Sequence, residues 1–523
     1  MTEPLLLITG DEQSRLDPAL PDGGLPPAVG VQSFQVFRAS PAVRPDGNGW
    51  TYHHHVDLAC WRGRLYVGWN SCEKDEDVWP SRELYSTSLD GRAWDAPREL
   101  FPQGISTPLR MYFFLASSDR MLAIAGMRSD THDTSEDRKG PLIVREIFPD
   151  HTLGAVFALQ GDSSTLDPFD ASLDPGFIAA CRELLADTVF LEQQDRGRLL
   201  GERRMKWHDA SAWPAGSVPG DNDKWVAGKA YSFFRRPDGM LVGISKMGWT
   251  TTSRDDGKTW SQPSVPSTLI TGKAKVWSQQ TADGRYALVY NPSARNRYPL
   301  AIATSDDGAT FRDMRIVQGE LPIQRYAGMH RSIGPQYVRG ISRWSDDGSR
   351  RGESVMWLVY SMNKEDIWVS RVPVPVIADA IDGNAPWNLY SPKWAPATVI
   401  DDDVRLEDRD PYDHAAATKV LPEITDAAIR FEVLAEQIGA ALHVDAYVKY
   451  EGLPATTIAV EPESAGEWTS CTLSIPGPAV HRVTFRTKPA RGVGGAHPVN
   501  PDTDRPTPPV AFRIRNLRIA AGS

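Results

Sequence analysis

The sequence contains little cysteine and no long apolar run. Its four cysteines are Cys60, Cys72, Cys181 and Cys471, and none of them shows the C-x-x-C spacing of a metal or redox site. Cys60 and Cys72 could meet across a hairpin, but general usage favours buried free thiols. No stretch approaches the ~18 apolar residues that a membrane-spanning helix needs. The N-terminal apolar run is four residues long and follows an acidic residue, which does not fit a signal peptide.

Basic side chains are outnumbered by acidic ones. The chain has 57 Lys and Arg against 67 Asp and Glu, a formal charge of -10 and a pI of about 5.6. General affinity for nucleic acid is therefore not expected, although a local cationic site could still bind an acidic small molecule. We expect a cytoplasmic protein without nucleic-acid or membrane partners. The sequence leaves the oligomeric state open.

Two short segments repeat. "SRDDGKTW" begins at Ser253 and "TSDDGATF" begins at Thr304, and both read S/T-x-D-x-G-x-T-aromatic. A degenerate copy, "TSLDGRAW", begins at Thr87 and has Leu89 in place of the first acid. The aspartate can accept hydrogen bonds from turn amides, glycine can take a positive φ, and the aromatic ring can pack under the turn. The repeats predict recurring β-turns.

These segments resemble the Asp-box of sialidases and related β-propellers. The resemblance implies a peripheral turn between the third and fourth strands of a blade, so Asp255 and Asp307 are expected to be structural. Short β-rich runs with glycine-centred turns surround the boxes and give five clear blades. Residues 161–225 fit least well, because "PGFIAACRELLADTVFL" reads as a helix that begins at Pro175. We interpret this region as an insertion or a damaged sixth blade.

The predicted fold is all-β, a six-bladed β-propeller (seven blades are possible) followed by a C-terminal β-sandwich. The predicted parts are an N-terminal segment 1–35, the propeller 36–375 with its insertion near 161–225, a proline-rich linker 376–397 and the sandwich 398–523. In the last part, Leu442, Val444 and Ala446 alternate with polar residues, as in half-buried strands. The sandwich is of the accessory carbohydrate-module type. Packing on the propeller is favoured as its role over sugar binding.

Three consecutive histidines stand in "YHHHVDL". Period-two alternation places His54 with Val56, and His53 and His55 with Asp57. A metal site from His53, His55 and Asp57 is geometrically conceivable, but zinc needs three or four converging ligands and the other histidines are scattered. We therefore predict no metal cofactor, and leave a structural calcium open.

The segment "HHHVDLACWRGRLYVGWN" resembles the first blade of sialidase-like exo-acting enzymes, which include glycosidases and propeller polysaccharide lyases. The resemblance matches His54 to the single histidine usual at this position, which acts as an acid or base in lyase and rhamnose-releasing relatives. A true sialidase has a FRIP-type arginine motif, three arginines that bind the sugar carboxylate and a Tyr–Glu nucleophile pair. No FRIP-like segment occurs here. Sialic acid is therefore not the expected substrate.

Other candidate residues lie near the predicted inner strands. Glycoside hydrolysis commonly uses two carboxyl groups, which the acidic loop pairs can supply, and the arginine-rich stretch 325–339 suits a sugar carboxylate. The predicted catalytic residues are His54, Glu76, Asp77, Tyr326, Glu365 and Asp366. The predicted substrate-binding residues are His53, His55, Arg110, Lys275, Gln279, Arg325, His330, Arg331 and Arg339.

Three functions compete. The first is an exo-acting glycoside hydrolase that removes a terminal sugar, other than sialic acid, from an oligosaccharide. The second is a lyase that acts on a uronic acid by β-elimination, with His54 or Tyr326 as base and an arginine neutralising the carboxylate. The third is a propeller that binds carbohydrate without catalysis.

Overall fold

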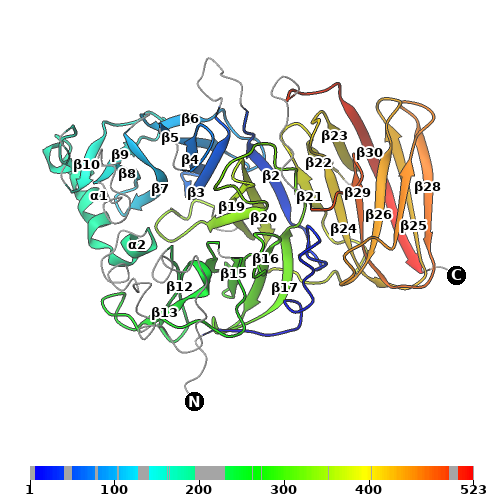
Figure 1. The fold of residues 1–523 in the computed structure, drawn as a ribbon, viewed down its shortest axis with the longest axis horizontal. Coiled ribbons are helices and arrows are strands. Elements are labelled where there is room, and N and C mark those ends of the chain that lie inside the picture. Colours follow the sequence, from blue (N-terminus) through cyan, green and yellow to red (C-terminus); the bar gives the residue numbers. More distant parts are fainter. Residues whose placement is uncertain are drawn as a thin grey trace.

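The computed structural model describes residues 6–40, 50–76, 80–102, 105–127, 141–161, 163, 165–194, 230–261, 263–272, 274–350, 353–401, 403–493 and 504–521. These residues form a β-propeller and a β-sandwich side by side (Figure 1). The predicted all-β propeller followed by a sandwich is confirmed. None of the helices within these ranges has the length and apolar character to cross a membrane.

Five sheets radiate from the centre of the propeller within the described residues (Figure 1). The first blade contains β3 (Tyr52–Trp61), β4 (Arg64–Cys72), β5 (Ser81–Ser88) and β6 (Arg98–Phe101). The second blade contains β7 (Ser106–Ala116), β8 (Arg120–Met127), β9 (Leu142–Ile147) and β10 (Phe157–Gln160). The third blade contains β11 (Ser232–Arg235), β12 (Leu241–Ile244) and β13 (Thr250–Ser253). The fourth contains β14 (Trp277–Gln280), β15 (Tyr286–Tyr290), β16 (Leu300–Ser305), β17 (Thr310–Gln318) and the short β1 (Leu7–Ile8). The fifth contains β18 (Pro335–Gly340), β19 (Val355–Met362), β20 (Asp366–Pro373) and β2 (Gln32–Phe37).

Helices lie between the second and third blades. The predicted helix is confirmed as α1 (Pro175–Ala186), followed by α2 (Thr188–Gln193) and preceded by the 3₁₀ turn η1 (Phe169–Ala171). The carboxylate of Asp174 caps α1 by accepting from the amides of Gly176 and Phe177, and Pro175 occupies the first helical position. The helices share an apolar cluster with β7 and β11. Because residues 195–229 lie outside the described ranges, a count of six blades stays a prediction.

Asp255 and Asp307 accept turn amides, as expected. In the box of Asp307 and in the box of Asp90, however, the acid stands one position later than the repeat pattern places it. In the second box the carboxylate that accepts the turn amides of Ala309 and Thr310, both at 2.8 Å, is Asp307. Asp306 instead pairs with exposed arginines. The supposedly degenerate box is intact, because Asp90 accepts from the amides of Arg92 and Ala93. The interpretation of Leu89 as a lost acid is therefore wrong.

We expect Asp307→Ala to lower the melting temperature by about 2–4 °C, because two turn amides lose their acceptor. Activity should stay at the wild-type level, since the box is a peripheral turn. Asp306→Ala is the matched control, and should change the melting temperature little because exposed ion pairs contribute little. A loss of activity in Asp307→Ala with unchanged melting would contradict the structural role.

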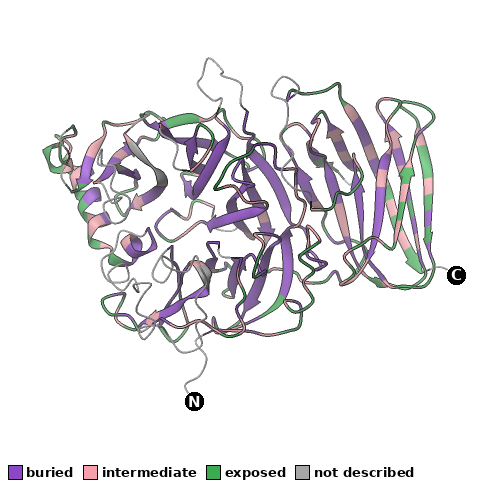
Figure 2. Ribbon diagram, in the orientation of Figure 1, coloured by how far each residue is buried: buried purple, intermediate pink, exposed green. Residues whose placement is uncertain are grey.

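The sandwich is joined to the propeller through one continuous sheet. Strand β2 pairs antiparallel with β20 of the last blade and parallel with β21 (Asn388–Ser391), which lies in the predicted linker. The sheet continues through β24 (Ala416–Ile424), β29 (Val480–Arg486), β26 (Leu442–Val448) and β27 (Thr456–Val460). The second sheet contains β22 (Ala397–Ile400), β23 (Asp403–Asp408), β30 (Val510–Ala521), β25 (Ala427–Ala435) and β28 (Trp468–Ile475). Alternate residues such as Leu442 and Val444 fill the core between the sheets, and Figure 2 shows the exposed bands on the outer strands.

All four cysteines are free thiols. Cys60, Cys72 and Cys181 are buried and Cys471 is half-buried. The expectation of free thiols is confirmed. The expected burial is confirmed for three of the four cysteines.

Candidate functional site

The first strands of neighbouring blades pack against one another around the propeller axis. Strand β3 contacts β7 and β18, and β14 contacts β11 and β18. Side chains from several blades therefore meet at one centre, which is where a propeller can assemble a site from distant parts of its sequence.

A β-bulge in β3 sets the positions of the three histidines. The pairing of β3 with β4 shifts register between His54 and Asp57, and His55 has φ +49°. Because a bulge breaks period-two alternation, His54 and His55 both reach the ring of Tyr337, with centroids 4.1 and 5.4 Å away. The predicted pairing of His53 with His55 on one side is wrong for this reason. His53 packs edge-on against Phe37 and contacts the carbonyl oxygen of Trp50.

A second bulge faces the first. In β18 the register shifts between Gln336 and Arg339, and Tyr337 has φ +59°. A positive φ at a non-glycine residue costs on the order of 1–3 kcal/mol and is concentrated at functional sites. Two such residues, His55 and Tyr337, lie in contact here. The strain at both indicates a site rather than ordinary core packing.

Four basic side chains surround the ring of Tyr337. The ammonium group of Lys246, in the 3₁₀ turn η4 (Lys246–Gly248), donates a hydrogen bond of 2.9 Å to its phenol oxygen. Lys275, Arg297 and Lys364 lie 5.4, 5.3 and 5.9 Å from the ring centroid. Burial alone would raise the pKa of the Tyr337 phenol, but the charges of Lys246 and Arg297 lower it to about 7. A substantial fraction of Tyr337 is therefore phenolate at neutral pH.

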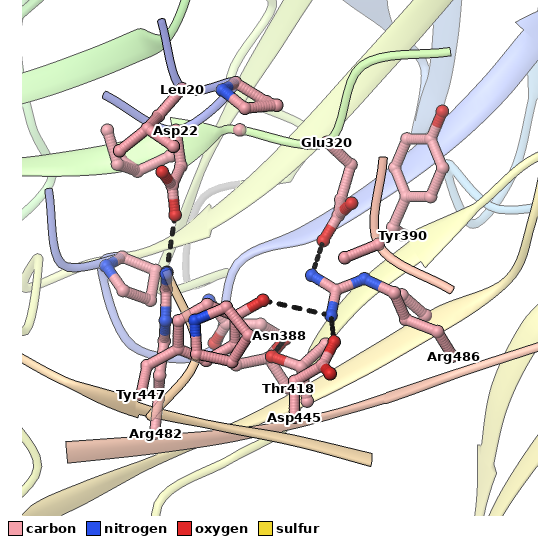
Figure 3. A pocket seen from close by; sticks show the side chains of 18 of the residues that line it. Leu20, Asp22, Glu320, Asn388, Tyr390, Thr418, Asp445, Tyr447, Arg482 and Arg486 are labelled. Atoms are coloured by element: carbon pink, nitrogen blue, oxygen red, sulfur yellow. Dashed lines mark hydrogen bonds and ion pairs between the residues drawn. The ribbon is translucent and has the colours of Figure 1, made fainter. Parts of the chain in front are cut away.

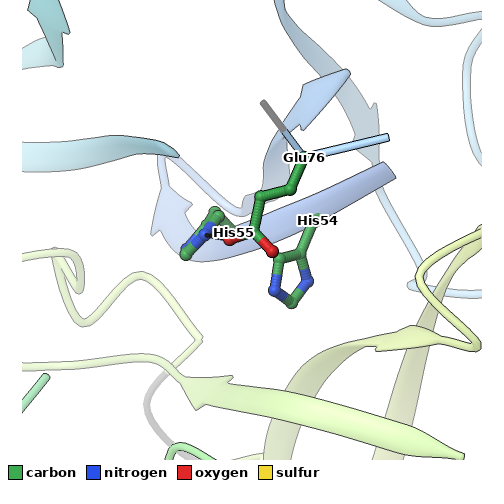
Figure 4. Close-up of side chains that lie close together, drawn as sticks. All are labelled: His54, His55 and Glu76. Carbon is green, nitrogen blue, oxygen red and sulfur yellow. Dashed lines mark hydrogen bonds and ion pairs between the residues drawn. The ribbon is translucent and has the colours of Figure 1, made fainter. Parts of the chain in front are cut away.

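Glu76 anchors the other side of the cluster (Figure 4). Its carboxylate accepts from the hydroxyl of Tyr52 at 2.9 Å and from the ammonium of Lys364 at 3.0 Å, and contacts Nε2 of His55 at 3.3 Å. Burial would raise the pKa of Glu76, but the contact with His55 and the charge of Lys364 hold it well below the usual range. Glu76 is thus ionised and fixes both His55 and Lys364.

Burial lowers the pKa of the histidines. Burial, with the nearby His55 and Lys364, lowers the pKa of His54 well below its usual value, and burial lowers that of His53 to about 3. Both rings are neutral at pH 7. His54 is fully buried, and neither of its ring nitrogens has a hydrogen-bond partner within the described residues.

A buried group of charges lies next to the histidines. Burial lowers the pKa of Lys275 well below its usual value, and the charges of Arg339 and Arg110 lower it further. Burial raises the pKa of Asp57 to about 6, and its carboxylate accepts from the amide of Phe113 at 2.9 Å. Arg339 lies between the rings of Tyr112 and Trp277. Among the predicted binding residues, Lys275, Arg339 and Arg110 therefore belong to the centre of the propeller.

Another predicted group forms a buried ion network where the propeller meets the sandwich. Glu365 accepts from the backbone amides of Arg325 and Tyr326, at 3.1 and 2.7 Å. Arg325 pairs with Asp366 and with Asp504, which also accepts from the hydroxyl of Tyr326. These side chains are engaged in fastening loops, which favours a structural role over the predicted catalytic one.

The remaining predicted residues lie at the edges. Arg331 is buried and donates to the carbonyl oxygens of Thr51 and Lys74, so it ties two loops together. His330 is partly exposed against Asp75, and Gln279 accepts from the indole of Trp277. Asp77 lies outside the described residues.

The sequence interpretation missed several central residues. They are Tyr52, Lys246, Arg297, Tyr337 and Lys364. Only Tyr337 stood in a stretch already noted for its polar density, between "RSIGPQ" and "VRG". Tyr52 begins strand β3, directly before the three histidines, whereas Lys246, Arg297 and Lys364 lie in turns or loops that carry no motif.

Two donor sets among the described residues have the spacing of a metal site, Cys60 with Asp346 and Asp347 at the surface and a second set at the propeller centre. His54, His55 and Glu76 each place a possible ligand atom within 4.8 Å of the others. The surroundings oppose a divalent cation, because Lys364 already binds Glu76 and further cations line the Tyr337 ring. The absence of a metal cofactor stays a prediction.

Family models match three parts of the chain. Residues 6–197 match the model described as BT_1020-like, N-terminal beta propeller; residues 225–332 match a BNR repeat-like domain; and residues 387–466 match the CBM domain of sialidase-like proteins. A search of curated proteins found no match.

A solved structure titled "Sialidase" superposes with a TM-score of 0.84 at 26% identity and covers 99% of this chain and 54% of that chain. The present chain thus spans about half of that protein. The sialidase of Trypanosoma rangeli in complex with 2,3-difluorosialic acid gives a TM-score of 0.38 at 9% identity, over 95% of this chain and 96% of that one. The α-L-arabinofuranosidase PaAbf62A of Podospora anserina gives 0.32 at 11% identity, over 66% and 98%. The chain is a sialidase-like Asp-box β-propeller joined to a sandwich of the carbohydrate-binding-module type.

Proposed function

We propose that the chain is an exo-acting glycoside hydrolase that removes an acidic terminal sugar, other than sialic acid, from an oligosaccharide. The observation that carries the proposal is Tyr337, a strained phenol of lowered pKa among four basic side chains. A phenolate is a nucleophile, and tyrosine is an established alternative to a carboxylate in some glycosidases. The cations attract a sugar carboxylate, and they also stabilise the negative charge of the phenolate beside it.

The proposed reaction has two steps. The phenolate oxygen of Tyr337 bonds to the anomeric carbon while the glycosidic C–O bond breaks, and the leaving oxygen takes a proton from His54. Water then attacks the same carbon and gives its proton to His54, and the bond to Tyr337 breaks and restores the phenolate. Before substrate binds, the ring of His54 is neutral. An anionic sugar beside the ring raises the pKa of His54, so that His54 is protonated in the complex.

The same cluster supports a second candidate. A phenolate at Tyr337 could instead remove the C5 proton of a uronic acid while the lysines and Arg297 neutralise the carboxylate. The leaving group at C4 would then depart by β-elimination.

Oligosaccharides that end in defined acidic sugars separate these functions. A hydrolase releases a saturated sugar acid with incorporation of water, whereas a lyase leaves a C4–C5 double bond that absorbs in the ultraviolet. Binding without turnover of any member of the panel would contradict both and favour a carbohydrate-binding propeller.

We expect Lys246→Met to move the acidic limb of the pH–rate profile. The reaction needs the phenolate, so wild-type turnover should rise with pH through about 7. Removing the adjacent ammonium raises the pKa of Tyr337, so the limb should move up by about one pH unit or more. Turnover at neutral pH should fall by about ten-fold or more as a result.

Lys258→Met is the matched control, since Lys258 is exposed on an Asp-box turn. Its pH profile should equal that of the wild type. An unmoved acidic limb in Lys246→Met would show that Tyr337 is not the titrating group.

A further inference from the structure

A cavity with a volume of about 330 Å³ lies between the propeller and the sandwich (Figure 3). This volume lies at the small end of the range for small-molecule sites, ~300–1,000 Å³. The floor is the outer face of the sandwich sheet, and the other wall comes from the N-terminal segment and from β17 and the residues after it.

Strand alternation gives the floor its polar character. On β29, Arg482, Thr484 and Arg486 face the cavity, whereas Val483 and Phe485 fill the sandwich core. On β26 and β24 the same alternation places Asp445, Tyr447 and Thr418 in the cavity. The face of the sheet that borders the cavity is therefore polar and brings several donors and acceptors together, so the arrangement points to a ligand.

The charges of the cavity are balanced. Three acids and three arginines line it, namely Asp22, Glu320, Asp445, Arg482, Arg486 and Arg491. Arg486 donates to Glu320 at 2.6 Å and to Asp445 at 2.5 Å, and Arg482 donates to Asp22 at 2.5 Å (Figure 3). With every acid paired, the site has no excess charge to neutralise and is poorly suited to an ionic ligand.

Hydrogen-bonding capacity nevertheless remains. The Nε atoms of Arg482 and Arg486 are buried and lack a hydrogen-bond partner among the described residues, although both side chains are more than nine-tenths buried. The paired carboxylates keep lone pairs, and the hydroxyls of Thr418 and Thr484 lie 2.9 Å apart on the floor. Such fixed, alternating donors and acceptors match sugar hydroxyls, each of which can donate and accept.

We propose that this cavity is a second carbohydrate site, which binds one residue of a neutral oligosaccharide. Independent support comes from the carbohydrate-binding-module model, which spans the segment that contains Asn388, Thr418, Asp445 and Tyr447. The site lies apart from Tyr337 and uses none of the cationic cluster. It therefore does not depend on the proposed hydrolase function.

The test is binding of short neutral oligosaccharides of xylose, mannose, galactose or arabinose to the full chain, measured by calorimetry. At least one class should bind with one site per chain, and Thr418→Trp, which fills the cavity, should weaken binding by about ten-fold or more. Thr472→Trp is the matched control on the exposed face of β28, and should bind as the wild type does.

Hydrogen exchange on the unaltered chain gives a second readout that needs no variant. The bound sugar should protect the backbone of residues 316–320, 445–447 and 482–486. No binding by any member of the panel, binding that Thr418→Trp leaves intact, or protection confined to the propeller centre would each overturn the proposal.

Discussion

Replacing Tyr337 by phenylalanine should reduce turnover by about 10³-fold or more, because the variant keeps the ring but loses the only atom that can bond to the sugar. The Michaelis constant should change little, since Lys275, Arg297 and Lys364 still surround the site. The variant should still fold, because the phenol oxygen contacts the ammonium group of Lys246 and does not pack in the apolar core.

Two measurements make this result specific. Tyr286→Phe removes the hydroxyl of another buried tyrosine, in the fourth blade, which donates to the carbonyl oxygen of Arg235 in the third, and should leave turnover unchanged. Mass spectrometry of the wild type with a slowly hydrolysed fluorinated substrate should find the sugar attached to Tyr337. Turnover above one tenth of wild type in Tyr337→Phe would exclude the phenol as nucleophile.

His54→Ala should lower turnover by roughly 10²–10⁴-fold, the usual contribution of a general acid or base. His54 is buried against Tyr337, so it is within reach of a group that bonds there. The variant should fold, because neither ring nitrogen holds another described part of the chain. Binding of an acidic substrate should persist.

The neighbouring histidines are the natural controls. His53→Ala removes a ring that packs on Phe37 and should affect stability more than catalysis. His55→Ala disturbs Glu76 and should have an intermediate effect. If His53→Ala or His55→Ala abolished turnover while His54→Ala left it near normal, the assignment of His54 would be wrong.

The fold was predictable because its signals are local. An Asp-box needs only a serine, an aspartate and a glycine within a few residues, so the turns of Asp255 and Asp307 could be recognised without any tertiary information. The position of the acid within the repeat pattern could not be predicted in the same way. Two aspartates are adjacent after Ser305, and which of them contacts its hydroxyl is decided only in the folded turn. Strand alternation likewise sufficed for the sandwich core.

The site was predictable only in part. His54 and Glu76 could be proposed from the first blade, where a resemblance and an acidic loop marked them. Tyr337 could not be singled out, because its position depends on a bulge that alternation rules do not foresee. Lys246 lies in a turn of the third blade, so its approach to Tyr337 depends on propeller closure, and Lys364 reaches Tyr337 from the β19–β20 turn of the same blade.

The acidic pair Glu365 and Asp366 illustrates the opposite error. Adjacent acids in a loop suggested the two carboxyls of a glycosidase. In the folded chain they accept backbone amides and pair with Arg325. Composition alone cannot distinguish an acid that serves catalysis from one that holds a loop.

The shared sheet at the junction constrains how the chain is made. Strand β2 leaves the ribosome early, but its partners β20 and β21 end at Pro373 and Ser391. The ring of blades therefore cannot close until most of the chain has been synthesised, and the N-terminal strand must wait unpaired during that time. Removing the sandwich would strip β2 of one neighbour and expose a strand edge, which is prone to pair with other chains. The two parts should consequently resist separation by truncation, and a shortened chain should be recovered as aggregate rather than as an isolated propeller.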